Sequence, residues 1–329
     1  MDIAEPLEKC AQQPGISVRP SERGAVLTLR QEDGEGAMEF IGLLPGVTLA
    51  YISIRAASWP APDLAPAAPD GKGPLIINYC VAGRCELELS GRDYAYLAPR
   101  QLSLTEQFAL RQYRYPRREY DGVELFIDLD GLDSAQLSAL GLEPRSLPGR
   151  FCPEGGAYSA AAPQTAEAHF KALWELANNG DDGYTRHRRC METLALLGVL
   201  EHSGTAAPHR AATYYTESQV LIARRTEELI TRELDRSHPA RELAALFSVS
   251  ETSVKNYFRG VYGQNISDYL REARMKRAAE LLVSTRLSVS DIAAQVGYAN
   301  QSKFSAVFRK TCGAAPMEYR RAHRVGKSE

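Results

Sequence analysis

Residues 237–263 read SHPARELAALFSVSETSVKNYFRGVYG, and residues 288–313 read SVSDIAAQVGYANQSKFSAVFRKTCG. The two stretches are copies of one duplicated helical unit, because apolar residues and glycines of the first stretch recur at matching positions in the second. A repeat at a fixed period marks a duplicated supersecondary unit. The offset changes within the unit, so the second copy has one extra residue in its central turn. The matching pairs are Val254/Phe304, Phe258/Phe308, Gly263/Gly313 and Tyr269/Tyr319 at an offset of 50, and Leu243/Ile292, Phe247/Val296 and Val249/Tyr298 at 49.

The first copy has the signals of a helix-turn-helix. Ser237 and Pro239 are placed to start a helix that runs to Phe247. After a short turn, Ser250 is placed to cap a second helix, which Gly263 ends.

The second copy follows the same plan. Ser288 and Asp291 have the spacing of a capping box, and Gly297 is expected to end the helix that they start. Asn300 is then expected to cap a helix over residues 301–311. The sequence therefore predicts two helix-turn-helix units of one design, at 237–263 and 288–313.

The second helix of each copy has one apolar and one polar face. Its paired aromatic or aliphatic residues lie four apart and are expected to face inward. Hydroxyl, amide and basic side chains occupy the other face, and these suit base edges and phosphates in a major groove. A polar helix face is often only solvated, but two matching sets of caps favour the DNA reader. The polar residues are Thr252, Lys255, Asn256 and Arg259, and Gln301, Ser302, Lys303, Ser305 and Arg309.

A spaced set of residues in the second copy is more specific than the helix-turn-helix pattern alone. With this spacing the last third of the chain resembles the AraC/XylS family of transcription regulators. The set is Ile292-Ala293, Gly297-Tyr298, Phe304, Phe308, Gly313, Pro316, Tyr319 and Arg320.

The resemblance implies two helix-turn-helix units joined by a long helix over 266–282, which holds two recognition helices about one DNA turn apart. It implies double-stranded DNA and RNA polymerase as partners, and members of the family mostly activate transcription. Ala306, the next contact position, has no hydrogen-bonding side chain and suits a thymine methyl group. The positions that match the family's base-reading sites are Thr252, Lys255, Asn256, Gln301, Ser302 and Ser305.

Charge is unevenly distributed along the chain. From residue 217 onward there are 19 Lys and Arg against 13 Asp and Glu, whereas the preceding part has 20 against 28. A basic excess in one part supports nucleic-acid binding by that part. The phosphate contacts that we expect there are Arg259, Arg309, Lys310 and Arg320.

The first part of the chain reads as short strands separated by turn signals such as Asp33-Gly34 and Ser90-Gly91. Many short antiparallel strands favour a barrel or jelly roll. This part resembles, loosely, the cupin-like sensor domains of the same family, and the overall fold class is α+β. The Pro-rich segment 60–74 is expected to be a loop. The expected strands cover residues 25–29, 48–54, 75–81, 85–89, 94–97, 110–115 and 123–129, with Glu124 and Asp128 facing out.

A barrel without a metal can enclose one small ligand, and we expect an effector here. None of the six histidines precedes His169, so we expect no imidazole metal site in it, no cofactor and no catalytic residues. The expected effector contacts are inward Tyr, Trp and Arg side chains, although aromatic residues at strand spacing are more often core. They are Trp59, Tyr79, Arg111 and Tyr113, with Tyr115 on the face of Tyr113.

Two helices are expected after the strands, over 166–177 and 184–202. The second has apolar residues on more than one face and needs partners on two sides. A second subunit is one such partner, which gives Met191, Leu194 and Leu197 as dimer contacts in a homodimer; burial within its own domain is the alternative.

The sequence thus predicts a sensor domain at 1–160, a helical dimerisation segment at 161–203, a linker at 204–216 and a DNA-binding domain at 217–324. No apolar run reaches the length that spans a bilayer, and no secretory signal is visible. The cysteines are expected to be reduced thiols in the cytoplasm. The alternatives are a regulator controlled by a protein partner, a DNA-binding enzyme fusion and a ligand carrier.

Overall fold

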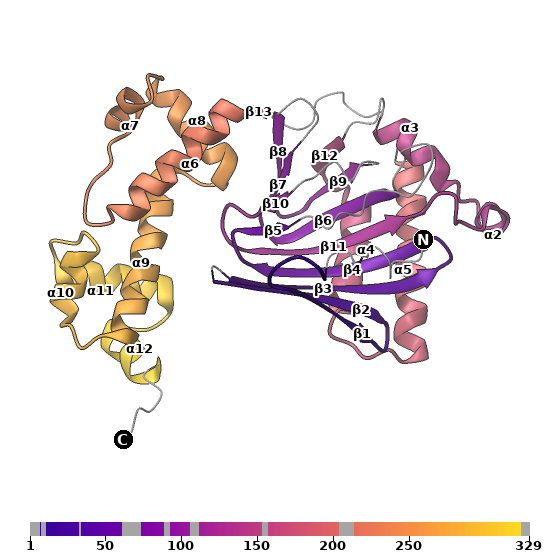
Figure 1. Cartoon of the computed structure of the whole chain (residues 1–329), viewed down its shortest axis with the longest axis horizontal. Helices are drawn as coiled ribbons and strands as arrows, with labels where there is room; N and C mark the ends of the chain where they lie inside the picture. The colour runs from indigo at the N-terminus through magenta and orange to yellow at the C-terminus, as the bar shows by residue number, and fades with distance from the viewer. Residues whose placement is uncertain are drawn as a thin grey trace. The chain divides into compact units, whose positions relative to one another are not determined.

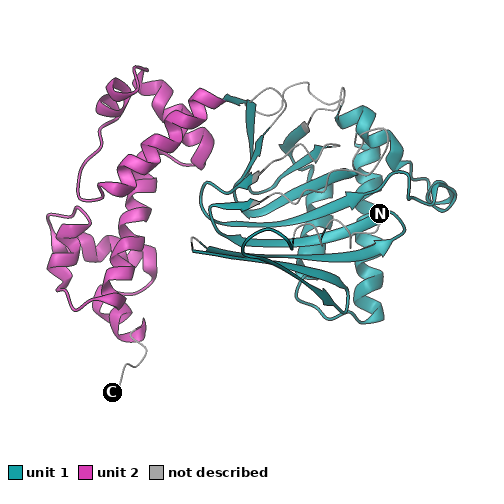
Figure 2. Cartoon of the chain, viewed as in Figure 1, with its two compact units in different colours: residues 1–216 teal, residues 217–329 magenta. Residues whose placement is uncertain are grey.

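The computed structural model describes residues 7, 11–32, 34–60, 74–88, 93–105, 112–152, 157–203 and 214–323. The chain divides into two compact units, residues 1–216 (unit 1) and 217–329 (unit 2), which Figure 2 colours separately. The described strands all lie in unit 1, and the described part of unit 2 is helical.

Two antiparallel sheets form the framework of unit 1 (Figure 1). Within the described residues the larger sheet has eight strands in the order β1-β2-β3-β4-β11-β6-β9-β12, and the smaller has five in the order β13-β8-β7-β10-β5. The strands of the larger sheet are β1 (Ile16–Ser21), β2 (Gly24–Gln31), β3 (Gly34–Leu44), β4 (Val47–Arg55), β6 (Leu75–Gly83), β9 (Gln101–Thr105), β11 (Tyr120–Ile127) and β12 (Ala157–Ala161). Those of the smaller are β5 (Ser58–Pro60), β7 (Cys85–Glu88), β8 (Asp93–Leu97), β10 (Gln112–Arg114) and β13 (Tyr215–Thr216).

Strand β11 is buried on both faces of the larger sheet. Val123 and Leu125 pack in a cluster with the helices, whereas Phe126 packs in a second cluster, to which both sheets contribute. The expectation that Glu124 faces solvent is wrong, because its exposed fraction is 3%. Alternation of polar and apolar residues indicates one solvated face only where nothing covers that face.

Helices cover the other face of the larger sheet (Figure 1). Phe170 of α4 stacks on Tyr79 of β6 with ring centres 4.4 Å apart, and the hydroxyl of Tyr51 donates to the backbone oxygen of Leu173 over 2.8 Å. The two long helices expected from the sequence are confirmed. The helical segments of this unit are α2 (Ser134–Ala139), η1 (Pro144–Ser146), α3 (Leu147–Phe151), α4 (Gln164–Glu175) and α5 (Gly183–His202).

The expected closed barrel is not found in the described part of unit 1, whose strands form two sheets instead. Strands are found at each expected position. Six further strands of the described residues were not predicted, namely β1, β3, β5, β9, β12 and β13, and β3 is the longest of them. The expected loop at 60–74 and the turn at 90–91 fall largely outside the described residues. Of the expected linker, residues 204–213 also lie outside them, and Tyr215–Thr216 form β13, which pairs with β8.

Unit 2 consists of seven helices in its described part, with the long α9 between two groups of three (Figure 1). The two helix-turn-helix units and the joining helix are confirmed as elements. The helices are α6 (Glu217–Arg232), α7 (Ala240–Leu246), α8 (Glu251–Tyr262), α9 (Ile266–Ser284), α10 (Val289–Gln295), α11 (Gln301–Cys312) and α12 (Pro316–His323).

The caps that the sequence predicted are present with one exception. Ser250 accepts from the backbone N–H of Ser253, and Asn300 accepts from that of Lys303. Ser288 and Asp291 form a reciprocal capping box, and Gly263 and Gly313 end α8 and α11 with φ near +77°. The predicted cap by Ser237 is wrong, because the residue before α7 is Pro239, which has no side-chain donor or acceptor.

Candidate nucleic-acid interface

Helices α8 and α11 are held in place by the side chains that the sequence predicted to face inward. Val254 and Phe258 of α8 are fully buried, and so are Phe304 and Phe308 of α11. Phe308 meets the ring of Tyr319 edge to face at 5.4 Å, and Phe258 meets that of Tyr269 at the same distance. The two copies therefore present their second helices through equivalent aromatic contacts.

The six predicted base-reading side chains lie on the outer faces of these two helices. Five of them are exposed, and Ser305 is half-buried. Lys255 lies 3.5 Å from the Glu251 carboxylate in an exposed ion pair, which contributes little and yields readily to a phosphate or a base. For Thr252, Asn256, Gln301, Ser302 and Ser305, no side-chain hydrogen bond is found within the described residues. Their donors and acceptors are therefore available to an external partner.

Three of the four predicted phosphate contacts are exposed, namely Arg259, Arg309 and Lys310. The prediction for Arg320 is wrong. Its side chain is 8% exposed, and its Nε and Nη2 donate to the backbone oxygens of Leu282 and Leu287 over 3.0 and 2.6 Å. Because the side chain is buried and two of its donors bind carbonyl oxygens, Arg320 is not placed to bind a phosphate at the surface.

The sequence reasoning missed Arg274 on α9. Its guanidinium donates to the backbone oxygens of Leu234 and Arg236 and lies over the ring of Tyr298. Burial lowers the pKa of Arg274, whereas Tyr298 opposes that shift. The role of Arg274 could not be predicted from its sequence neighbours, because its hydrogen-bond acceptors are backbone oxygens some forty residues away.

The effector contacts expected in unit 1 do not share one pocket. Trp59 is 1% exposed and packs with Tyr113 on the side of the larger sheet that faces the smaller sheet. Tyr79 packs on the opposite side, against the helices, where burial raises its pKa to about 12. A single site lined by both is excluded. Arg111 lies outside the described residues.

A polar group that the sequence did not indicate lies between the two sheets. Asn78 donates through Nδ2 to Glu124 Oε1 over 2.8 Å, and the Tyr120 hydroxyl donates to Asn78 Oδ1. Burial raises the pKa of Glu124 to about 8, and the hydrogen bond from Asn78 opposes that shift. The Trp59 indole N–H, in the same cluster of residues, has no hydrogen-bond partner among the residues that the structure describes. Unsatisfied and neutralised groups of this kind are candidates for ligand contacts.

Helix α5 turns most of its apolar residues inward. Leu197 is fully buried against the larger sheet, so its prediction as a dimer contact is wrong. Leu194 is partly buried against the same cluster. Met191 is 51% exposed and Tyr184 69% exposed, and these two remain on the outer face.

Cys80 and Cys85 have the properties of buried thiols, and burial raises the pKa of Cys80 to about 12. Cys190 and Cys312 are partly buried thiols. A thiol with a raised pKa forms little thiolate, the reactive species. Among the described residues no group of three His, Cys, Asp or Glu side chains is placed to hold a metal ion.

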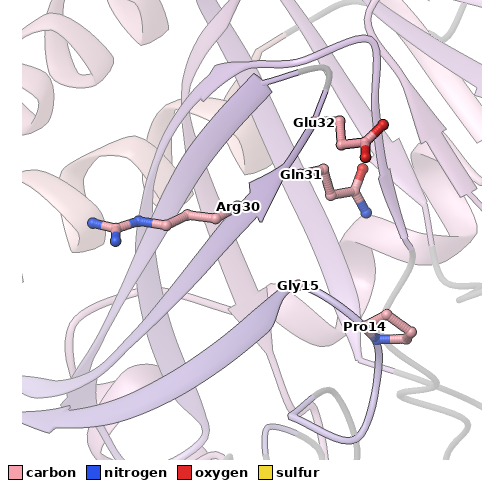
Figure 3. A pocket seen from close by; sticks show the side chains of 5 residues that line it. All are labelled: Pro14, Gly15, Arg30, Gln31 and Glu32. Atoms are coloured by element: carbon pink, nitrogen blue, oxygen red, sulfur yellow. The ribbon is translucent and has the colours of Figure 1, made fainter.

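One surface hollow in the described part of unit 1 lacks convergent polar groups. It is lined by Pro14, Gly15, Arg30, Gln31 and Glu32. In Figure 3 the Arg30 side chain points away from Gln31 and Glu32, so the charged groups do not face a common point. A ligand pocket needs polar groups that converge, and this hollow supplies none.

Comparison with known proteins identifies the domain that carries α8 and α11. Residues 243–322 match the family model of a helix-turn-helix domain. Unit 2 carries an AraC-type helix-turn-helix domain. The resemblance inferred from the sequence is therefore confirmed for this part of the chain.

The relatives of this helix-turn-helix domain are transcription regulators. Over 70 residues the chain is 43% identical to the HTH-type transcriptional activator RhaR of Yersinia pseudotuberculosis serotype O:1b, a match that covers 21% of this chain and 24% of RhaR. RhaR of Mannheimia succiniciproducens is 42% identical over 69 residues, which cover 21% of this chain and 25% of that protein. The chain thus spans about a quarter of the length of the curated relatives it matches.

A solved structure matches the same domain. The C-terminal domain of AraT, a response regulator from Geobacillus stearothermophilus, is 31% identical; the match covers 33% of this chain and 90% of that domain, with a TM-score of 0.32. In the described part of this chain, no helix is both long and apolar enough to cross a membrane.

Proposed function

We propose that this chain is a sequence-specific DNA-binding transcription regulator, an activator in the manner of RhaR, and not an enzyme. The observation that carries the proposal is the pair α8 and α11. These helices are equivalent in sequence, caps and aromatic support, and each leaves hydroxyl and amide groups free on its outer face. A DNA-binding regulator of this kind acts on the chromosome, so we propose that it is located in the cytoplasm.

In this proposal each recognition helix reads one segment of a major groove. Asn256 and Gln301 pair with base edges, with adenine as the preferred base for both, because an amide donates and accepts on one edge. Ala306, exposed on α11, contacts a thymine methyl. Arg259, Arg309 and Lys310 bind phosphates and supply affinity that does not depend on sequence.

Selection from a randomised duplex library tests this proposal. The full chain should enrich sequences with two separated half-sites, one for each recognition helix. A double variant, Asn256→Ala with Gln301→Ala, serves as the control and should enrich poorly defined sequences from the same library. A wild-type chain that enriches nothing contradicts the proposal.

We further propose that unit 1, a cupin-like sensor domain at 1–160 with the helical segment 161–203, responds to a small molecule and passes its signal through the linker 204–216. The supporting observation is the polar group of Asn78, Glu124 and Tyr120, together with the Trp59 indole N–H, for which the described part of the chain supplies no hydrogen-bond partner. In this proposal the contacts to mutate are these residues together with Tyr113 and Arg111, whereas Tyr79 lies on the opposite side of the larger sheet. A thermal-shift screen of the full chain, followed through Trp59 and Trp174, both in unit 1, should find a stabilising metabolite. If only a protein partner stabilises unit 1, the effector is a protein.

We also propose a homodimer through the outer face of α5, and contact with RNA polymerase at the promoter. Met191 and Tyr184 support the first of these, since both are large apolar or aromatic side chains left exposed on one helix.

A further inference from the structure

Arg274 lies at the junction between the two helix-turn-helix units. It belongs to α9, the helix that joins them. Its Nε donates to the backbone oxygen of Leu234 over 2.8 Å, and its Nη2 donates to that of Arg236 over 2.9 Å. Both oxygens belong to the segment between α6 and α7, which leads into the first unit. Charge-assisted bonds from a planar guanidinium fix direction as well as distance, so α9 is held to that segment in one orientation.

The same guanidinium also contacts the second unit. Its central carbon lies 5.7 Å from the centre of the Tyr298 ring. A Cβ built on Gly297 would lie 2.6 Å from Nη2 of Arg274 and 2.7 Å from the Leu234 oxygen. Gly297 and Tyr298 form the turn that precedes α11. The entry segment of the first unit, α9 and the turn of the second unit therefore meet at one point.

A second arginine, Arg320, makes the same kind of backbone contact as Arg274 but only within the second helix-turn-helix unit. From α12 it donates to the backbone oxygens of Leu282, in the last turn of α9, and of Leu287, in the segment that leads from α9 into the second unit. Each helix-turn-helix unit is thus closed by an arginine from the helix that follows it. No contact from Arg320 to the first unit is found among the described residues. Arg274, like Arg320, binds the backbone oxygens at the entry of the helix-turn-helix unit that precedes it. Unlike Arg320, Arg274 also contacts the turn of the other helix-turn-helix unit, at Gly297 and Tyr298.

The equivalent turn residues of the two copies differ in how closely other residues approach them. Ser248 and Gly297 are equivalent, and both have positive φ, +55° and +80°. Ser248 is exposed and carries a side chain. Gly297 has no room for one, because the Arg274 guanidinium and the Leu234 oxygen cover it. The second copy therefore has a close contact at its turn for which the first copy has no equivalent.

We propose, resting on the DNA-binding function proposed above, that Arg274 is a positioning residue for operator recognition. It fixes the turn before α11 against the entry segment of the first unit and so sets the spacing and rotation at which α8 and α11 meet DNA. One base pair more or less between two half-sites rotates one of them by about 36° around the duplex. A rigid pair of readers rejects that change, and a loosely joined pair tolerates it.

The test measures affinity as a function of half-site spacing. The full chain and its Arg274→Met variant, which keeps the length of the side chain, are titrated with the enriched operator and with versions one base pair longer or shorter between the half-sites. The ratio of affinities between the best and the altered spacing should shrink by about tenfold in Arg274→Met, because the bonds that fix the two readers are lost. Base preference within each half-site should stay as in the wild type. Arg274→Lys, which keeps the cation over Tyr298, should give an intermediate ratio.

Ser248→Ala is the matched control, since it changes the equivalent turn away from the junction and should leave the spacing ratio unchanged. If Arg274→Met does not fold, Gly297→Ala disturbs the same contact from the other side and should lower the ratio in its place. Equal weakening at every spacing, an unchanged ratio, or a wild type without spacing preference overturns the inference. A wild type that enriches no sequence contradicts the proposed DNA-binding function itself. Failure of that function can therefore be distinguished from failure of the inference about Arg274.

Discussion

Glu124 has an unusual environment for a carboxyl group. It lies between the two sheets among apolar and aromatic side chains, with Asn78 as its donor. Burial raises its pKa to about 8, against 4.5 for the free side chain. The folded protein therefore holds a proton at this site over a pH range in which the unfolded chain has released it. The stability that this proton supplies is complete below about pH 4.5 and is lost as the pH rises towards 8.

Replacing Glu124 with Gln should remove this dependence on pH. Glutamine keeps the shape and the acceptor for Asn78 but never ionises. Between about pH 4.5 and 8 the free energy of unfolding of unit 1 should fall in the wild type and stay flatter in Glu124→Gln, with a gap of a few kcal/mol, roughly, at pH 8. Urea unfolding followed by tryptophan fluorescence measures it, because both tryptophans lie in unit 1. Asp130→Asn, which removes an exposed carboxylate, is the control. Parallel pH profiles for wild type and Glu124→Gln would contradict the burial argument.

Ser248 is a non-glycine residue in the left-handed region, with φ of +55°. Strain of about 1–2 kcal/mol attends such a residue, and the added freedom of glycine in the unfolded chain offsets part of the gain from removing it. Ser248→Gly should therefore raise the free energy of unfolding of unit 2 by about 0.5–1 kcal/mol. Gly297→Ala should lower it by more, because strain and close contact act together there. Helix content followed by circular dichroism during unfolding tests both, and a destabilised Ser248→Gly variant would refute the strain.

Among the secondary-structure elements, those of unit 2 were the more predictable from sequence. Helix caps and C-terminal glycines act over three or four residues. The ends of α8 and α11 could therefore be predicted from nearby residues alone, namely Ser250, Asn300 and Gly313. The faces of strands depend on partners far along the chain. Whether Glu124 meets water or a second sheet is decided by strands that its own neighbours do not specify.

The recognition faces show the same limit. The amphipathic spacing of α8 and α11 identified which side chains point outward. Charge alone could not separate Arg309, which is exposed, from Arg320, whose acceptors are carbonyl groups 38 and 33 residues away. Basic residues of one type in one domain thus have opposite roles, and only tertiary contacts distinguish them.

Removing one amide from a recognition helix should affect individual bases. Asn256→Ala and Gln301→Ala should each cost about 1–3 kcal/mol on the preferred operator and relax preference at one or two positions. Their affinity for unrelated duplex should change little, since phosphate contacts are retained. Binding titrations against single-base operator variants measure the effect. Full sequence discrimination in both variants would show that the reading face is placed wrongly.

Arg309 of α11 should act differently, through phosphate. Arg309→Ala should weaken binding to all sequences alike and reduce the salt dependence of log K by about one unit of slope. Lys276→Ala, an exposed cation on α9 outside the recognition helices, is the control and should leave the slope unchanged. A loss confined to one operator position would contradict the phosphate role.

At the scale of the whole molecule, unit 1 and the DNA-binding domain are joined by a strand that runs directly into a helix. β13 pairs with β8 in the smaller sheet of unit 1 and ends at Thr216, and α6 begins at the next residue. A ligand that shifts the smaller sheet therefore acts on a strand covalently continuous with the first helix of the DNA-binding domain. If unit 1 binds the proposed effector, this continuity provides a route by which the ligand shifts the population of DNA-competent arrangements without any change inside the helix-turn-helix units.

Self-association through the proposed homodimer should depend on the exposed face of α5, because the large side chains of Met191 and Tyr184 remain exposed there. Met191→Lys places a charge where an apolar side chain is half exposed and should weaken the homodimer by at least about tenfold, a loss of about 1.4 kcal/mol. Sedimentation velocity over a concentration series measures it, and tryptophan fluorescence checks that unit 1 remains folded. Leu140→Lys changes another exposed apolar residue of unit 1, outside α5, and should leave the dimer intact. If both variants weaken association alike, the effect follows from added charge rather than from α5. If neither does, the dimer uses another face, and the exposed residues of α5 are free to meet RNA polymerase.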